Sequence, residues 1–174
     1  MTNSELLNSG GLKDYPIFEG MSDNQILEIQ KSIRPGNYKK GEFIWKEDDS
    51  GRDVLLLMEG TIQISQSLTL FPSEADEGEY DKSIVLLKAE DRPIIGEIAL
   101  CTNTPRSASL KAITDVKTGL LTIQDIDEVV KGDPFFGVLF YRNLANIIGE
   151  RLITANKNVL KLTTAFSLAL RHGA

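Results

Sequence analysis

The chain has 174 residues, a length typical of one domain. Hydrophobic residues make up 41% and charged residues 25%, which excludes a disordered chain, and no apolar run is long enough to cross a membrane. The net charge of -6 argues against a protein that coats nucleic acid non-specifically.

Cysteine and histidine usage narrows the class of protein further. A single cysteine, Cys101, excludes an internal disulfide framework. The N-terminus has no secretory signal pattern, so we expect a reducing, cytoplasmic compartment. The single histidine, His172, argues against a His-rich metal centre and against Ser-His or Cys-His catalysis. We therefore expect a protein that is not an enzyme and that holds no metal or other cofactor.

The first zone of the chain, residues 1–30, contains one predicted helix. Ser22 precedes the apolar residues Ile26 and Ile29, and Gln25 follows it by three positions. This spacing is typical of a capping box, in which Ser22 is the N-cap.

The second zone, residues 31–123, alternates short β-like runs with turn residues. The predicted strands are 43–45, 54–58, 61–65, 83–87, 108–112 and 118–123. Many short strands without helices between them indicate a mainly β fold with flanking helices, in the form of a β-roll or jelly-roll barrel. Such barrels often host metals, but no histidine lies in this zone, which argues against a jelly-roll metalloenzyme. Residues 71–81 form an acidic loop.

The third zone, residues 124–174, is predicted to be helical, which completes a single domain over residues 1–174. A short helix over 124–131 stops at Gly132. A long helix follows over about 134–170, with Asp133 as N-cap and Pro134 in the first helical position.

Two apolar lines run along the long helix. The line that we expect to pack on the barrel is short and consists of Phe136, Phe140, Leu144 and Ile147. The other, here called the seam, has alternating spacings of three and four: Val138, Tyr141, Ala145, Ile148, Leu152, Ala155, Val159, Leu162, Phe166 and Ala169. Such spacing is typical of a coiled coil, so we expect a two-fold homodimer through the second half of the helix. The alternative is that both lines bury against one core.

Residues 95–109 carry the strongest functional signal. Gly96 allows a close approach of the backbone to a ligand, and residues 97–101 can form one helical turn with outward N–H groups. Arg106 offers a planar fork to a phosphate, and Ser107 adds a hydroxyl donor. Glu97 is an acceptor suited to a sugar hydroxyl. One segment therefore combines groups that match a phosphate and a ribose.

This segment resembles the phosphate-binding cassette of cyclic nucleotide-binding domains, which are found in bacterial catabolite activators and in the regulatory subunits of cAMP-dependent kinase. The matching motifs are Gly96-Glu97-Ile98-Ala99-Leu100 and Pro105-Arg106-Ser107-Ala108-Ser109. Three further matches extend over most of the chain: Phe18 with Met21, Lys40-Gly41-Glu42-Phe43-Ile44, and Val54 to Gly60.

The resemblance implies a role for each matching residue. Arg106 would hold the exocyclic oxygens of the cyclic phosphate, beside Ser107. Glu97 would accept from the ribose 2′-hydroxyl, with Gly96, Ile98 and Ala99 around it. Serine at position 107 favours cAMP without excluding cGMP.

In the catabolite activators, polar residues about one turn past an Arg-Leu pair of the long helix meet the base. Here that pair is Arg151-Leu152, and the family's threonine-serine pair aligns with Ala155-Asn156, so the resemblance implies base contacts by Asn156 and Thr154. The alternative is that Thr154 and Asn156 are solvated helix positions.

The resemblance also implies a function and marks departures from the family. Arg92-Pro93 replaces the glycine-aspartate turn that usually precedes the Gly-Glu pair. Only four residues follow Leu170, so we expect no helix-turn-helix and no direct DNA binding. The expected function is a cyclic nucleotide sensor that signals through its long helix to an unknown effector protein, away from any membrane. The alternative is an interaction module that keeps the fold and binds no nucleotide.

Overall fold

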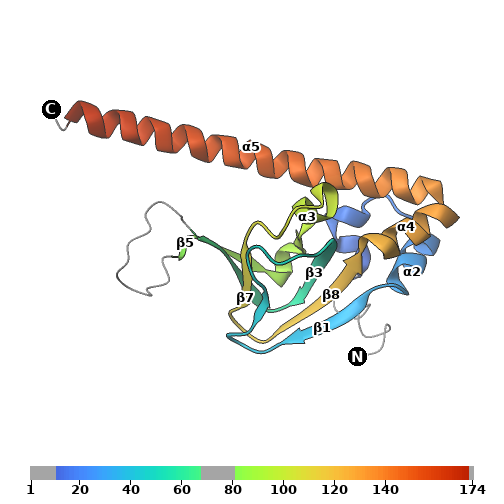
Figure 1. Ribbon diagram of the computed structural model, residues 1–174. Helices are drawn as coiled ribbons and strands as arrows, with labels where there is room; N and C mark the ends of the chain where they lie inside the picture. The colour runs from blue at the N-terminus through green and yellow to red at the C-terminus, as the bar shows by residue number, and fades with distance from the viewer. Residues whose placement is uncertain (1–10, 68–80, 173–174) are drawn as a thin grey trace.

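The computed structural model describes residues 11–67 and 81–172. Figure 1 shows a β-rich body, the helices α2 (Asp23–Gln30) and α4 (Ile123–Gly132) at one end of it, and one long helix, α5 (Pro134–His172), that lies over the body and then extends far beyond it. The mainly β fold with an N-terminal helix and a long C-terminal helix is therefore confirmed. Most of the predicted acidic loop, residues 71–80, falls outside the described residues.

Eight strands and several helices make up the described chain. The strands are β1 Arg34–Tyr38, β2 Phe43–Trp45, β3 Asp53–Glu59, β4 Thr61–Ser67, β5 Asp81–Lys88, β6 Ile94–Ile95, β7 Ser109–Ala112 and β8 Val116–Thr122. The α-helices are α2 Asp23–Gln30, α3 Glu97–Thr102, α4 Ile123–Gly132 and α5 Pro134–His172. The short 3-10 helices are η1 Leu12–Asp14, η2 Pro16–Phe18 and η3 Ala89–Asp91.

The strands form two antiparallel sheets, with the orders β1-β8-β3-β6 and β2-β7-β4-β5. The central strand β3 explains why its sequence is continuously apolar rather than alternating. Val54 and Leu56 pack with the N-terminal and C-terminal helices, whereas Leu55 and Leu57 pack between the two sheets. Because both faces of β3 are covered, every position from 54 to 58 is buried.

The sequence prediction missed the strands β1 and β6, and it assigned Ile123 to the wrong element. β1 contains Pro35 and Gly36, which argue against a strand, but it lies at a sheet edge where proline is tolerated. A Cβ at Gly36 would lie 2.5 Å from Oγ1 of Thr118 on β8, so the pairing requires glycine there. Ile123 does not end a strand; it begins α4, because Thr122 caps that helix in a capping box with Asp125.

The predicted N-caps Ser22, before α2, and Asp133, before α5, are confirmed. The hydroxyl of Ser22 accepts from the backbone N–H of Gln25 at 3.3 Å, and the backbone N–H of Ser22 donates to Gln25 Oε1 at 3.0 Å. Asp133 Oδ1 accepts from the backbone N–H groups of Phe135 and Phe136. These contacts satisfy donors that have no partner within their own helix.

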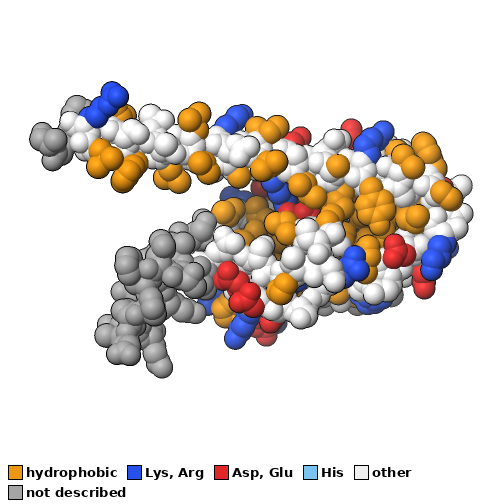
Figure 2. All heavy atoms as spheres, turned by 45° about the horizontal axis from the view of Figure 1, so that its top comes forward, with side chains coloured by type: hydrophobic (Ala, Val, Ile, Leu, Met, Phe, Trp, Pro, Cys, Tyr) orange, Lys and Arg blue, Asp and Glu red, His pale blue; other side chains and the backbone are white. Residues whose placement is uncertain are grey.

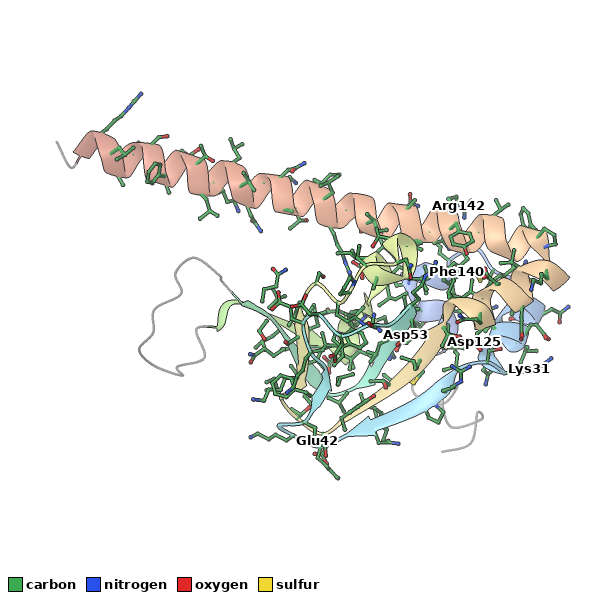
Figure 3. The ribbon with its side chains drawn as sticks, viewed as in Figure 1. Lys31, Glu42, Asp53, Asp125, Phe140 and Arg142 are labelled. Atoms are coloured by element: carbon green, nitrogen blue, oxygen red, sulfur yellow. The ribbon has the colours of Figure 1, made fainter. Side chains whose placement is uncertain are left out.

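The first half of α5 is anchored on the body. Phe136, Phe140 and Leu144 are buried in the main core, as predicted, and Ile147 packs against them (Figure 3 shows Phe140 directed toward the body). The buried side-chain amide of Asn143 donates to the backbone carbonyls of Ile17 and Glu19, which ties the helix to the N-terminal segment.

The second half of α5 leaves the body, and its side chains are exposed from residue 150 to residue 171. Seam residues are uncovered in this chain, since Val159 is 61% and Phe166 66% exposed. The alternative in which both apolar lines bury against one core is therefore wrong. Among residues 11–67 and 81–172, no helix is both long enough and apolar enough to cross a bilayer.

A matched pair of phenylalanines tests the anchoring of α5. We expect Phe140→Ala to lower the free energy of unfolding by about 3–5 kcal/mol, because it removes a fully buried ring and leaves a cavity. Phe135→Ala is the control, since Phe135 is 63% exposed on the same helix. Urea denaturation of both variants measures the difference. Equal losses would show that α5 does not pack on the body through Phe140.

Candidate functional site

A cavity of about 420 Å³ lies between the β-rich body and the start of the free half of α5. Figure 2 shows apolar side chains on the body and on the helix around the hollow between them. Its walls come from β2, β4, β5, β6, α3, the loop before β7, β7 itself, and α5. The lining residues are Trp45, Ile64, Gln66, Val85, Ile95, Gly96, Glu97, Ile98, Ala99, Arg106, Ser107, Ala108, Leu110 and Arg151.

Arg106 is the central cation of this cavity and is only 5% exposed. Its Nη2 lies 2.6 Å from Asp53 Oδ1, and its Nη1 donates to the backbone carbonyl of Asp53 at 2.9 Å. Its guanidinium carbon lies 3.8 Å from the ring centroid of Trp45. The guanidinium is thus fixed by a carboxylate at one side and by an aromatic face at another.

Burial lowers the pKa of the Arg106 guanidinium, while the carboxylates of Asp53 and Asp49 act in the opposite direction. An arginine in a protein stays protonated across the physiological range despite such a shift. The cavity therefore contains a permanent positive charge whose position is set by β3 and β2. This is the arrangement that an anionic ligand group requires.

Gly96 allows Arg106 to reach this position. It has a φ of 95°, in the left-handed region, and it precedes α3 directly. A Cβ at this position would lie 2.6 Å from Arg106 Nη1 and 2.7 Å from the carbonyl oxygen of Asp53. Any other residue would be strained there and would displace the guanidinium.

Glu97 is the anion of the cavity and is 4% exposed. Its Oε1 lies 2.5 Å from Nη1 of Arg151, and Nη2 of Arg151 donates to the backbone carbonyl of Ile94 at 2.6 Å. Arg151 stands where α5 leaves the body. The cavity floor and the long helix are therefore joined by one ion pair.

The structure brings six of the eight predicted site residues to one cavity. These are Gly96, Glu97, Ile98, Ala99, Arg106 and Ser107. Thr154 lines a neighbouring cavity of about 590 Å³, and its hydroxyl donates to the backbone carbonyl of Glu150 at 3.0 Å. Asn156 is exposed further along α5 and is not among the residues that line the first cavity.

Four polar or aromatic residues that line or support the cavity were not predicted as functional positions: Trp45, Asp53, Gln66 and Arg151. Asp53 and Trp45 both contact Arg106, but Trp45 was predicted only as part of a strand, and Asp53 directly precedes a predicted strand. Arg151 and Gln66 line the cavity and were likewise not predicted to contact the ligand. No local signal identifies these residues, because they come from separate segments that meet only in the folded chain.

The comparisons with known proteins agree with this geometry. The model of the cyclic nucleotide-binding domain family matches residues 35–133, more than half of the chain. The chain belongs to the cyclic nucleotide-binding domain family.

Two curated relatives illustrate the family. The chain is 26% identical over 169 residues to a cAMP-dependent protein kinase regulatory subunit of Mycosarcoma maydis, a match that covers 94% of this chain and 30% of the relative. It is 25% identical over 130 residues to human cGMP-dependent protein kinase 2, covering 75% of this chain and 15% of the kinase. The chain thus spans less than a third of the length of either relative.

Solved structures share the fold. The Thermus thermophilus catabolite activator protein has a TM-score of 0.69 at 22% identity, covering 85% of this chain and 63% of that one. A cyclic nucleotide-binding domain from Methylobacillus flagellatus has a TM-score of 0.72 at 18% identity, covering 91% and 82%. The regulatory domain of Toxoplasma gondii PKA, solved with cAMP, has a TM-score of 0.61 at 18% identity, covering 80% and 49%.

Removal of Asp53 tests whether the buried Asp53–Arg106 ion pair stabilises the fold. We expect Asp53→Ala to lower the free energy of unfolding by about 3–5 kcal/mol, because it leaves Arg106 buried without its counter-ion. Asp115→Ala is the control, since Asp115 pairs with Lys39 at the exposed surface. We expect its unfolding midpoint in urea to stay close to that of the parent. Equal midpoints for the two variants would contradict a structural role for the buried pair.

Proposed function

We propose that this chain binds a cyclic nucleotide, with cAMP as its preferred ligand, in the cavity between the body and α5. One observation supports the proposal above the others. A buried, fixed guanidinium and a buried carboxylate from the same short segment line one cavity of about 420 Å³. That size suits a small ligand.

The two charges suit the two polar parts of such a ligand. Arg106, with Ser107 next to it, is placed to bind the cyclic phosphate by charge-assisted hydrogen bonds. Glu97 is placed to accept from a ribose hydroxyl, with the backbone of Gly96 and Ile98 beside it. The preference for cAMP rests on Ser107 and on the relatives named for that nucleotide.

The route of the signal follows from the Glu97–Arg151 ion pair. A ligand hydroxyl that binds Glu97 competes with or reorients Arg151, and Arg151 belongs to α5. Ligand binding then shifts the balance between positions of α5 to the extent that it binds one position more tightly. In this proposal the chain is a non-catalytic, cytoplasmic regulatory domain that needs no cofactor and passes its signal to an effector protein.

Conservative substitution of Arg106 tests nucleotide binding. We expect isothermal titration calorimetry to show cAMP binding by the parent, and Arg106→Lys to weaken it about 10- to 150-fold through the loss of a charge-assisted contact. Circular dichroism verifies that the variant is folded. Arg142→Lys, on the exposed surface of α5, is the control and is expected to bind as the parent does. If the parent binds neither cAMP nor cGMP, the chain is instead an interaction module with a conserved fold and an unused cavity.

We also propose that the chain forms a two-fold homodimer through the second half of α5. The seam continues at coiled-coil spacing beyond the body, and its large members are exposed: Leu152 by 59%, Val159 by 61%, Leu162 by 70% and Phe166 by 66%. The charged residues after Leu152, which are Lys157, Lys161 and Arg171, lie outside the seam. A second copy of the same helix would bury the apolar residues of both chains and leave the charges in water.

Charge introduced into the seam tests the homodimer. We expect light scattering at micromolar concentration to give a dimer for the parent and a monomer for Val159→Glu combined with Phe166→Glu, because a dimer would bury four unpaired carboxylates. Thr164→Glu, on the same helix but outside the seam, is the control and should remain dimeric. A monomeric parent would disprove the dimer and leave nucleotide binding untouched.

A further inference from the structure

Gln66 gives the cavity a neutral group that both donates and accepts hydrogen bonds. It lies on β4, two residues after Ile64, so strand alternation places both side chains on the same face, and both line the cavity. The Gln66 side-chain Nε2 donates to the backbone carbonyl of Ser107 at 2.6 Å. The carboxamide is therefore held at the cavity wall next to the segment that carries Arg106.

Under the proposed function, the other polar groups of the cavity bind the phosphate and the ribose of the nucleotide. The guanidinium of Arg106 and the hydroxyl of Ser107 suit the phosphate, and Glu97 with Arg151 suits the ribose. The remaining wall is apolar and includes Ile64 and Val85. Such a wall suits the flat face of a base but does not distinguish one purine from another, since both have an apolar face.

The geometry points to Gln66 as the residue that selects the base, an inference that rests on the proposed nucleotide binding. A carboxamide has two N–H donors and one carbonyl acceptor, and the contact with Ser107 uses one donor. The carbonyl oxygen and the second N–H can pair with the amino group and the ring nitrogen at one edge of adenine. The corresponding edge of guanine carries two acceptors, which leaves the Gln66 carbonyl without a donor.

This assignment replaces the role that the sequence analysis gave to Thr154 and Asn156. Neither residue lines the cavity within its own chain, whereas Gln66 does. It also makes selectivity a property of the β-rich body rather than of the long helix. A substitution at Gln66 can then change which nucleotide is preferred without changing the position of α5.

The experiment measures the ratio of the dissociation constants for cGMP and cAMP by calorimetry, in the parent and in Gln66→Met. We expect the parent to prefer cAMP by about 5- to 150-fold, the range that one well-made pair of hydrogen bonds to a base provides. Gln66→Met keeps the length of the side chain and removes its polar atoms. It should reduce the ratio by about fivefold or more, mainly by weakening cAMP binding.

Gln63→Met is the matched control. Gln63 lies on the same strand at an odd spacing from Gln66, so it faces the other side of the sheet, and it is not among the lining residues. We expect its cGMP to cAMP ratio to equal that of the parent. Thermal unfolding of both variants verifies that each is folded at the temperature of the titration.

Three outcomes would overturn the inference, and they are distinguishable. Equal weakening of both nucleotides in Gln66→Met would show that Gln66 only positions Ser107. An unchanged ratio with unchanged affinities would show that Gln66 does not contact the ligand. A parent that binds neither nucleotide would remove the proposed function itself and the base assignment with it.

Discussion

The buried cation Arg106 is the constraint on which the rest of the site depends. A guanidinium that is 5% exposed is stable only if charge and hydrogen bonds replace the lost water. Asp53 supplies both, and Trp45 covers one face of the group. The left-handed Gly96 leaves the space that the guanidinium occupies. Four residues from three segments are therefore required for one buried charge.

The same site is joined to the long helix through a second ion pair. Glu97 begins α3, and Arg151 stands on α5 where that helix leaves the body. Residues before this point are held by a fully buried aromatic pair and by Asn143, and residues after it are exposed. The end of the anchored half thus coincides with the edge of the cavity. From there α5 extends far beyond the body (Figure 1).

The strand β3, which begins at Asp53, is buried on both faces. Its alternate residues belong to two separate cores, one toward the helices and one between the sheets. Asp53, at the start of this strand, is therefore fixed in position and can orient Arg106 (Figure 3). The strand β3 therefore belongs to both cores and also carries the carboxylate that orients Arg106.

The sequence by itself determined the fold class, the N-caps of α2 and α5, the apolar line that anchors α5, and the segment from Gly96 to Ser107. Each of these rests on residues that are close in the chain, where spacing and local hydrogen bonds suffice. Only the tertiary structure decided that β1 forms at a sheet edge, that Asp53 and Trp45 hold Arg106, and that Arg151 meets Glu97. It also placed Gln66 in the cavity and Thr154 outside it. These facts depend on contacts between distant segments, which no local pattern encodes.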